Sequence, residues 1–549
     1  MTRPLPDCRR LLTALLGALV VARALPAQQA LGPGEDAWTL PGGIFRFGVA
    51  PRLLSATDMF GANGVRGPLG GPYSGLLGVA AFPTLQSLEG TIGSLSGQPA
   101  FRVILGTARA NLQQAIGIIP FELSAGVTNR ITFRVSAPFF TGEQQADWML
   151  DGSTASVGMN PDLLSAGAAP LNAGLLDGLD SAATSLEHLA DGCVVNAASD
   201  PRCAQVTGNL AAVRALIAQA RTMSDGIAQT YGGRTTVPPS LFVPLLNSAA
   251  HSAIVAQIGV LRSGFAEYGT ASVAAGAAPA APGAPLTAND LRTLLADSTY
   301  GYGPGAVNRR YRQGFGDMDV GVSFLVYNGL KSADKWSRET PPHLAFRQTL
   351  GFTYRIGTGT PPDPDDPLAL ATGDGRNDLE FMSATDVVAN RHAWASVIVL
   401  YTRQQAREGI ARIPDGSGSP FIPIARRKLA RTELGDRFAF EASPRWVLND
   451  FLAAGVRYRY THAAGETITE LAPSGPAPMS YAAPSTTTHE IGIGFTWSSI
   501  AAWRRKAVSL PLELQYEHTL VVAGNGGVPR FTADRVSLRA YFRLWGAGR

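Results

Sequence analysis

The chain has 549 residues, of which 46 are basic and 42 acidic. Four basic residues and one acidic residue precede residue 28, so removal of that stretch would leave a net charge of +1. A nearly neutral chain lacks the basic surface that nucleic acid requires, and we expect no nucleic-acid partner. No later stretch approaches the roughly 18 uninterrupted apolar residues of a membrane helix, which excludes a helical inner-membrane protein.

The first thirty residues have the three-part layout of a secretory signal peptide. Arginines precede an apolar core at residues 11–21, and small residues suited to cleavage follow it. This core is too short to span a bilayer, and a buried N-terminal helix is the weaker alternative. We predict a signal peptide at residues 1–27 with cleavage after Ala27, or alternatively after Ala24 or Ala30, and hence an exported protein.

Cysteine usage agrees with export. Cleavage would remove Cys8 and leave Cys193 and Cys203. An even pair, close in sequence, in an exported protein indicates one local disulfide. Two cysteines alone offer too few ligands for a metal. We therefore predict a disulfide between Cys193 and Cys203.

Period-two alternation of apolar and polar residues recurs along the chain and predicts β-strands. In the last of these segments, Val536, Leu538 and Phe542 alternate with Ser537 and Arg539. Lengths near ten residues suit tilted transmembrane strands better than the five or six residues usual in soluble sheets, where the same pattern would cover a core. About twelve segments qualify, at 45–49, 121–127, 131–137, 318–326, 350–356, 378–388, 392–403, 438–446, 452–460, 491–497, 510–516 and 535–545.

The connections and aromatic residues favour a membrane barrel. Long connections at 358–378 and 463–486 contrast with a tight reversal at Asn449 and Asp450, and one end with short turns is typical of a barrel facing the periplasm. Aromatic residues near strand ends fit the interfacial girdles of such barrels, with ordinary packing as the alternative; they are Trp446, Tyr458, Tyr460, Trp497, Tyr541 and Trp545. The predicted fold class is all-β: an antiparallel transmembrane β-barrel of about 12 strands with a large, mostly helical insert.

Two regions do not follow the strand pattern. Residues 59–100 are rich in glycine and predict a loop. Residues 160–300 show helical periodicity, with a stripe formed by Leu210, Val213, Leu216, Ile217 and Ala220. An insert of this length exceeds a periplasmic turn and would serve as a cap or a plug. The predicted division is a signal peptide (1–27), N-terminal barrel strands with the glycine-rich loop (28–159), the helical insert (160–300) and C-terminal barrel strands (301–549).

The polar faces of the strands predict the lining of the lumen. Ten arginines stand on these faces against five acids, which predicts a positive potential that favours anions. In a soluble sandwich the same side chains would form solvated faces. The predicted lumen-lining residues are Arg134, Arg347, Arg355, Arg457, Arg459, Arg539, Arg543 and Glu513.

No catalytic motif stands out. The serines of GSLSG at 93–97 do not have the spacing of a nucleophile elbow. His489 begins HEIGIGF without a second histidine at helical spacing, and His518 is expected at the rim or lipid interface. We predict no enzyme, no metal and no cofactor. One acidic stretch could hold Ca²⁺, with a solvated loop as the favoured alternative; it contains Asp363, Asp365, Asp366, Asp374 and Asp378.

The phrases SAGVTNRITFRVSAPFF (124–140), GFGDMDVGVSFLVY (314–327), TGDGRNDLEF and RAYFRLW resemble elements of Gram-negative outer-membrane barrels labelled as transporters. They are similar to the phenol-degradation meta-pathway outer-membrane proteins, over residues 105–140 and 310–545. The resemblance implies a barrel, but no substrate residue is carried over. Many such barrels end on an aromatic residue that the assembly machinery recognises, whereas residues 546–549 follow Trp545 here.

The resulting functional hypothesis is a barrel of the cell outer membrane that passes small solutes, aromatic or anionic compounds, by passive transport. Its expected partners are outer-membrane lipid, the barrel-assembly machinery and a small-molecule solute. Two alternatives stay open. One is a non-conducting structural or surface-binding barrel, and the other is an outer-membrane hydrolase.

Overall fold

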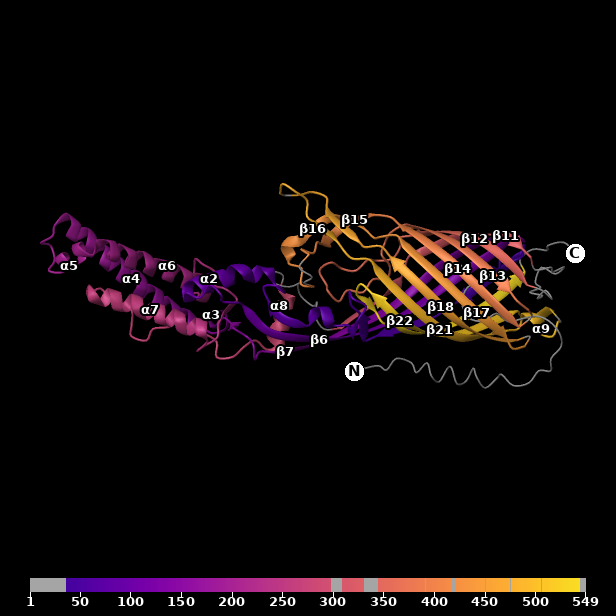
Figure 1. Ribbon diagram of the computed structural model, residues 1–549, viewed down its shortest axis with the longest axis horizontal. Coiled ribbons are helices and arrows are strands. Elements are labelled where there is room, and N and C mark those ends of the chain that lie inside the picture. Colours follow the sequence, from indigo (N-terminus) through magenta and orange to yellow (C-terminus); the bar gives the residue numbers. More distant parts are fainter. Residues whose placement is uncertain are drawn as a thin grey trace.

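The computed structural model describes residues 36–297, 309–329, 344–390, 392–416, 420–449, 451–473, 475–504 and 506–543. Twelve antiparallel strand paths close into a barrel (Figure 1). The predicted fold class and strand number are therefore confirmed. The predicted signal peptide, Cys8, Asp450 and Trp545 lie outside the described residues.

The barrel wall closes where the last strand meets the first. Its first path is split into β1 (Ile44–Val49) and β2 (Arg52–Ala56), and both parts pair with β6 on one side and β24 on the other. Pro51 lies in the interruption and has no N–H to donate to a neighbouring strand. The remaining wall strands, in order, are β6 (Ile104–Thr128), β7 (Ile131–Asp151), β11 (Met318–Asn328), β12 (Ala345–Ile356), β13 (Asp378–Val388), β14 (Ala393–Gln404), β17 (Arg437–Val447), β18 (Leu452–Ala463), β21 (Thr486–Ser498), β22 (Leu512–Asn525) and β24 (Thr532–Arg543).

Each strand has the apolar outer face and polar inner face that its alternation predicts. Large apolar side chains are exposed on the outside of the wall, among them Phe133, Phe381, Ile493 and Leu538. Apolar side chains are more stable in contact with hydrocarbon than in contact with water, so this face suits a lipid bilayer. The prediction that Tyr541 belongs to an aromatic girdle is wrong. Tyr541 lies between two residues whose side chains point outward, so its own side chain points into the barrel. There it is 2% exposed and donates a hydrogen bond to Glu513.

The two ends of the barrel differ in their connections. At one end the links from β6 to β7, from β13 to β14 and from β17 to β18 are short, whereas the link from β21 to β22 contains α9 (Ile500–Arg504). This short-turn end also holds the start of β1 and the end of β24. At the other end, the long-loop end, the links are longer and carry extra elements: β10 (Arg309–Phe315), β15 (Arg407–Arg412), η3 (Ile424–Arg426), β16 (Arg427–Glu433), β19 (Thr467–Glu470), β20 (Ser480–Ala482) and β23 (Val528–Pro529). Short turns face the periplasm in outer-membrane barrels.

Strands β6 and β7 extend past the long-loop end as a paired hairpin. They run for 25 and 21 residues, and their pairing continues from Thr128↔Ile131 to Thr107↔Asp151. At about 3.3 Å per residue, such strands are far longer than a membrane crossing requires. The helices at their far end lie beyond the barrel and outside its lumen (Figure 1). This position favours a cap over a plug.

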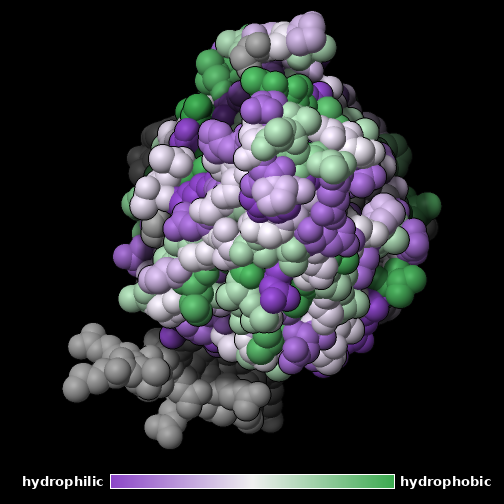
Figure 2. Space-filling model, turned by 90° about the vertical axis from the view of Figure 1, so that its left-hand side faces the viewer, coloured by the Kyte–Doolittle hydropathy of each residue, from purple (hydrophilic) through white to green (hydrophobic). Residues whose placement is uncertain are grey.

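The insert beyond the hairpin is an antiparallel helical bundle. The stripe predicted on α6 packs inward, with Val213, Ile217 and Ala220 buried and Leu210 and Leu216 packed against the same core. Seen from this end, hydrophilic and hydrophobic residues are interspersed on the surface (Figure 2). None of the helices in the described ranges is long and apolar enough to cross a membrane. The elements are β8 (Val157–Met159), α3 (Pro161–Leu164), α4 (Ala168–Val195), α5 (Cys203–Gly208), α6 (Leu210–Tyr231), β9 (Phe242–Pro244), α7 (Ala249–Glu267) and α8 (Ala288–Ala296).

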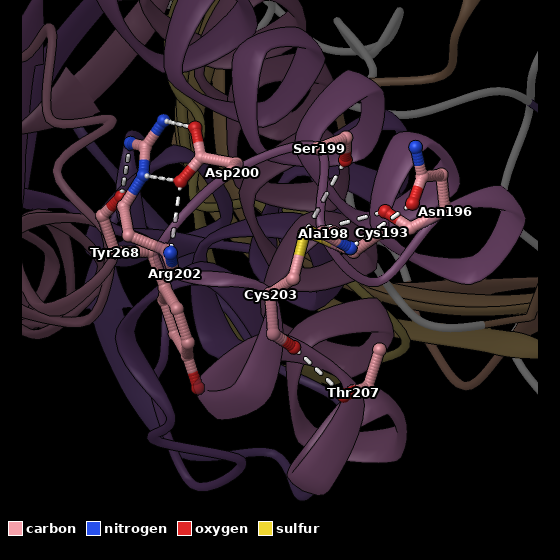
Figure 3. Close-up of a disulfide and its surroundings, with 9 residues drawn as sticks. All are labelled: Cys193, Asn196, Ala198, Ser199, Asp200, Arg202, Cys203, Thr207 and Tyr268. Carbon is pink, nitrogen blue, oxygen red and sulfur yellow. Dashed lines mark hydrogen bonds and ion pairs between the residues drawn. A yellow bond between two sulfur atoms is a disulfide. The ribbon is translucent and has the colours of Figure 1, made fainter.

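Cys193 and Cys203 form a disulfide that joins α4 to α5 at the tip of the bundle (Figure 3). Arg202 braces the same loop, because its guanidinium binds Asp200 and donates to the Tyr268 carbonyl at 2.7 Å. These hydrogen bonds from Arg202 lower the pKa of Asp200 to about 2. The tip is therefore fixed by one covalent and one ionic link.

Residues 59–100 are not the loop that their glycine content predicts. They contain β3 (Asp58–Phe60), β4 (Arg66–Pro68), η1 (Gly71–Tyr73), β5 (Gly75–Gly78), η2 (Pro83–Leu85) and α2 (Gln86–Ser96). In α2 the buried residues Leu88, Ile92 and Leu95 recur at helical spacing. Gly97 ends the helix in the left-handed region, which glycine adopts without strain. The glycines are concentrated before α2, and they obscured the short helix that follows.

Candidate functional site: the barrel lumen

The first described residues of the chain lie inside the barrel. The N-terminal segment (residues 36–43) contacts inner-face side chains of five different wall strands, β7, β12, β13, β17 and β24. Only a segment inside the wall can reach all five. It occupies the short-turn end, where Leu40 is 1% exposed and packs with Ile44 and Tyr541.

The contacts of the N-terminal segment come from side chains of the wall. Asp386 accepts a hydrogen bond from the Ala37 N–H at 3.1 Å, and Thr349 donates one to the Ala37 carbonyl at 2.5 Å. Thr132 accepts one from the Leu40 N–H at 2.8 Å. The rings of Trp38 and Tyr541 lie 6.0 Å apart, and Asp36 lies 3.9 Å from Arg445. At its end the Gly42 N–H donates to the Asn129 side chain at 3.1 Å, and the Gly43 N–H donates to the Gly126 carbonyl of β6 at 2.8 Å.

Three cavities follow one another along the strands from the long-loop end to the short-turn end. The first, the vestibule, has a volume of about 620 Å³ and mostly apolar walls that include Met59, Leu434 and Tyr481. The second, the arginine cavity, has about 250 Å³ and is lined by Ala50, Arg52, Ile118, Pro120, Glu441, Arg457, Arg459, Glu517, Thr519 and Arg535. The third has only about 50 Å³ and lies against the N-terminal segment. Of these three cavities among the described residues, the smallest is the one beside the N-terminal segment.

Arg457 is the centre of an ionic network in the arginine cavity. Its guanidinium contacts Glu517, Glu441 at 3.4 Å and Glu490 at 3.6 Å. Glu490 also lies 3.7 Å from Arg52. Removal of one partner from such a buried network leaves the others without charge compensation. The network thus fixes three carboxylates of different strands on one arginine.

Arg459 is placed differently, although it is only two residues away. It stands opposite Glu441 and Glu490 in the strand register, yet both carboxylates turn to Arg457. Within the part of the chain that the structure describes, Arg459 makes no hydrogen bond and no ion pair within 4.0 Å. It lines the cavity and is partly exposed.

The other residues predicted to line the lumen lie on the inner face at several heights. Arg347 pairs with Asp386, and Arg355 pairs with Asp319 at 2.9 Å. The third cavity is lined by Arg134 and Arg539, while Glu513 accepts from Tyr541 and Arg543 lies exposed at the short-turn end. The structure therefore does not bring the predicted set into one site. Arg457 and Arg459 share the arginine cavity, and Arg134 and Arg539 share the third cavity.

The predicted ratio of ten inner arginines to five acids is too high. The structure adds two arginines to the inner face, Arg437 and Arg535, but four acids, which are Asp378, Glu380, Asp386 and Glu490. Three of these acids lie on β13, whose alternation of apolar and polar residues is irregular, so its inner face was not predicted. Glu490 was not predicted as an inner residue because only the apolar face of its strand was considered. Positive charge is therefore local to cavities and not general to the lumen.

The acidic loop between β12 and β13 binds arginines. Asp365 contacts Arg412 at 2.9 Å and Arg427 at 2.8 Å, and Asp366 contacts Arg310. Burial alone would raise the pKa of Asp365, but hydrogen bonds from the two arginines outweigh it and lower that pKa. No group of three metal-binding side chains occurs among the described residues. Asp365 and Asp366 of this loop are thus ion-pair partners.

The histidines of the wall have structural neighbours. His518 pairs with Asp534 at 2.9 Å on the outer face, where Tyr516 donates to the same carboxylate. His489 contacts the Tyr458 hydroxyl at 2.8 Å. In the described ranges, no serine or cysteine is hydrogen-bonded to either ring. Neither of these two rings therefore stands beside a serine or cysteine nucleophile within those ranges.

A scan against protein-family models finds no match to this chain, and a search of curated proteins finds none. Among solved structures, the chain is similar to the COG4313 outer membrane channel from Pseudomonas putida F1, with 9% identity and a TM-score of 0.40 over 93% of this chain and 99% of that one. The Pseudomonas putida toluene transporter TodX matches with 8% identity and a TM-score of 0.20 over 94% and 96% of the two chains. A Pseudomonas aeruginosa FadL homologue matches with 9% identity and a TM-score of 0.23 over 91% and 90%.

Such distant likenesses carry no argument about solutes or residues. The pairing of the strands and the direction of their side chains are independent of them. A closed wall leaves no unpaired strand edge in lipid, and its apolar outer face meets the hydrocarbon. The chain is a β-barrel of the outer membrane.

Proposed function

We propose that this barrel is a passive channel for small solutes and that the N-terminal segment is its gate. The observation that carries the proposal is the position of residues 36–43, which fill the lumen at the short-turn end while two larger cavities stay free above them. A solute entering from the long-loop end would pass the vestibule and the arginine cavity. It would then meet the segment.

The segment is suited to move because its bonds are not needed for the pairing of the wall strands with one another. Withdrawal of residues 36–41 would break bonds to the side chains of Asp386, Thr349 and Thr132, and the backbone bond from Gly43 to Gly126 of β6 could remain as the hinge. Each bond of this kind contributes about 1 kcal/mol. A non-conducting barrel with a permanently fixed segment is the alternative, and conductance separates the two.

The N-terminal segment passes very close to the backbone of Gly126 in the wall. A Cβ built on Gly126 of β6 would lie 2.1 Å from the Pro41 carbonyl oxygen and 2.6 Å from that of Leu40. An alanine therefore cannot coexist with the segment in place. On the adjacent strand β1, a Cβ on Gly48 would meet its nearest neighbour at an ordinary 3.7 Å.

The test is the ion conductance of purified full-length protein in planar lipid bilayers. Gly126→Ala should displace the segment and raise the open fraction or the conductance several-fold, because the added methyl group collides with the segment and not with a neighbouring wall strand. Gly48→Ala should behave like the unchanged protein. If Gly126→Ala folds, as judged by a heat-dependent shift in gel mobility, and still conducts no more than Gly48→Ala, the gate proposal is wrong.

A further inference from the structure

We infer that the arginine cavity is a binding site for a small organic monoanion with an apolar body. This inference rests on the proposed channel function and names a class of solute that the channel would take. It is carried by the cavity's free volume, its charge balance and the state of Arg459.

The free volume of the arginine cavity is suited to a small ligand. Its volume of about 250 Å³ is just below the roughly 300–1,000 Å³ of pockets for drug-sized ligands. It is lined by side chains of β2, β6, β17, β18, β22 and β24. A solute in this cavity would therefore be surrounded by the wall, with little room for bulk water.

The charges around the cavity are unevenly shared. The three carboxylates of the network, those of Glu441, Glu490 and Glu517, all contact Arg457. Because three carboxylates surround it, Arg457 has no positive charge to offer a ligand. Arg459, two residues away, lines the same cavity without a carboxylate within ion-pair distance among the described residues.

Arg459 is the group that would hold the anion. Its guanidinium lines the free space and has no partner among the described residues within ion-pair distance. A guanidinium presents a planar fork of donors that matches a carboxylate. In a narrow, poorly hydrated cavity, such a charge-assisted bond is stronger than it would be in water.

One wall of the cavity carries three apolar residues beside Arg52. Ala50, Ile118 and Pro120 come from the stretch between β1 and β2 and from β6, which lie apart from the two arginines of β18. An inorganic anion would leave this wall uncovered. An aromatic or short aliphatic carboxylate would cover it while its head group meets Arg459, which is why the site suits an organic monoanion.

The test measures equilibrium binding of benzoate and of the neutral isostere benzamide to the full-length barrel in detergent by calorimetry. We expect benzoate to bind at least about tenfold more tightly than benzamide, since only benzoate forms the charge-assisted bond. Arg459→Gln should remove this preference, and Arg459→Lys should keep part of it. Arg543→Gln is the matched control, because it removes an inward arginine that lies outside the cavity.

Two results would overturn the inference. One is failure of benzoate to bind the unchanged protein, and the other is equal binding of benzoate and benzamide, which would mark an apolar site. A heat-dependent gel shift for each variant guards against misfolding. Binding is measured on the closed barrel, so it can fail while Gly126→Ala still opens the channel, or succeed when no variant conducts.

Discussion

At the scale of single residues, the lumen shows how two arginines of the same type and strand face can differ. Arg457 and Arg459 both follow from the alternation of β18, and the sequence predicts both as inward. It does not predict their partners, because the three carboxylates around Arg457 come from β17, β21 and β22. The face on which a side chain lies follows from the alternation of residues within its own strand. Its ion-pair partners depend instead on the register between strands that are distant in sequence.

A second residue-scale feature lies in the helical bundle. His251 of α7 is 4% exposed, its ring lies beside that of Tyr231, and neither the His251 Nδ1 nor the Tyr231 hydroxyl has a hydrogen-bond partner within the described residues. Burial lowers the pKa of His251 and raises that of Tyr231. The bundle therefore folds around a neutral histidine.

This burial predicts a pH-dependent stability of the bundle. The folded pKa of His251 lies below its ordinary value of about 6.5, so the unfolded chain takes up the proton first as pH falls. Stability should be full above about pH 6.5 and decline below it, by at most about 1.4 kcal/mol per pH unit. Thermal melting of the helical circular dichroism signal at pH 7.5 and 5.5 measures this.

Two variants provide the comparison for the pH experiment. His251→Phe should flatten the dependence on pH, and His188→Gln, which changes an exposed histidine of α4, should leave it unchanged. If His251→Phe loses as much stability between the two pH values as the unchanged protein does, another group controls the titration.

At the scale of elements, the disulfide and the long hairpin set the shape of the insert. The disulfide closes a loop with a sequence separation of 10 residues, which makes its chain-entropy effect modest. Replacement of both Cys193 and Cys203 by serine should destabilise the bundle by about 2–3 kcal/mol and leave the barrel unaffected. The helical signal should melt at a lower temperature, while the gel shift of the barrel stays at its original temperature. A matching fall in both transitions would contradict the independence of the two parts.

Some elements were predictable from the sequence pattern and others were not. The wall strands were predictable because large apolar residues alternate on them over about ten residues. The outer half of the β6–β7 hairpin was not, because its buried positions include small residues such as Ala108 and Ala110, whose alternation gives a weak signal. The N-terminal segment was also missed. Its eight residues have no regular period, and only contacts with five strands place it.

At the scale of the whole molecule, the barrel and the helical bundle are stabilised by different interactions. The barrel wall depends on strand pairing and lipid, and the bundle has its own apolar core around α4, α6 and α7. The number of strands and the helical insert followed from the sequence. The cavities did not, since they depend on where the N-terminal segment lies and on which ion pairs form across the lumen.

The central claim is that the N-terminal segment must leave the lumen for solutes to pass. Ala37 packs against Ala384 of β13, and both side chains are fully buried. Cysteines at these two positions, in Ala37→Cys/Ala384→Cys, should form a disulfide that locks the segment to the wall. Either single variant controls for the cysteine itself, and the unchanged protein with reductant controls for the native disulfide.

The decisive measurement is bilayer conductance of this double variant in a Gly126→Ala background, before and after addition of a reductant. We predict a closed barrel under oxidising conditions and recovery of the Gly126→Ala conductance within the same bilayer once the cross-link is reduced. Equal conductance in both states, with the cross-link shown to be present and then absent, would contradict the account, because the segment would not control the path.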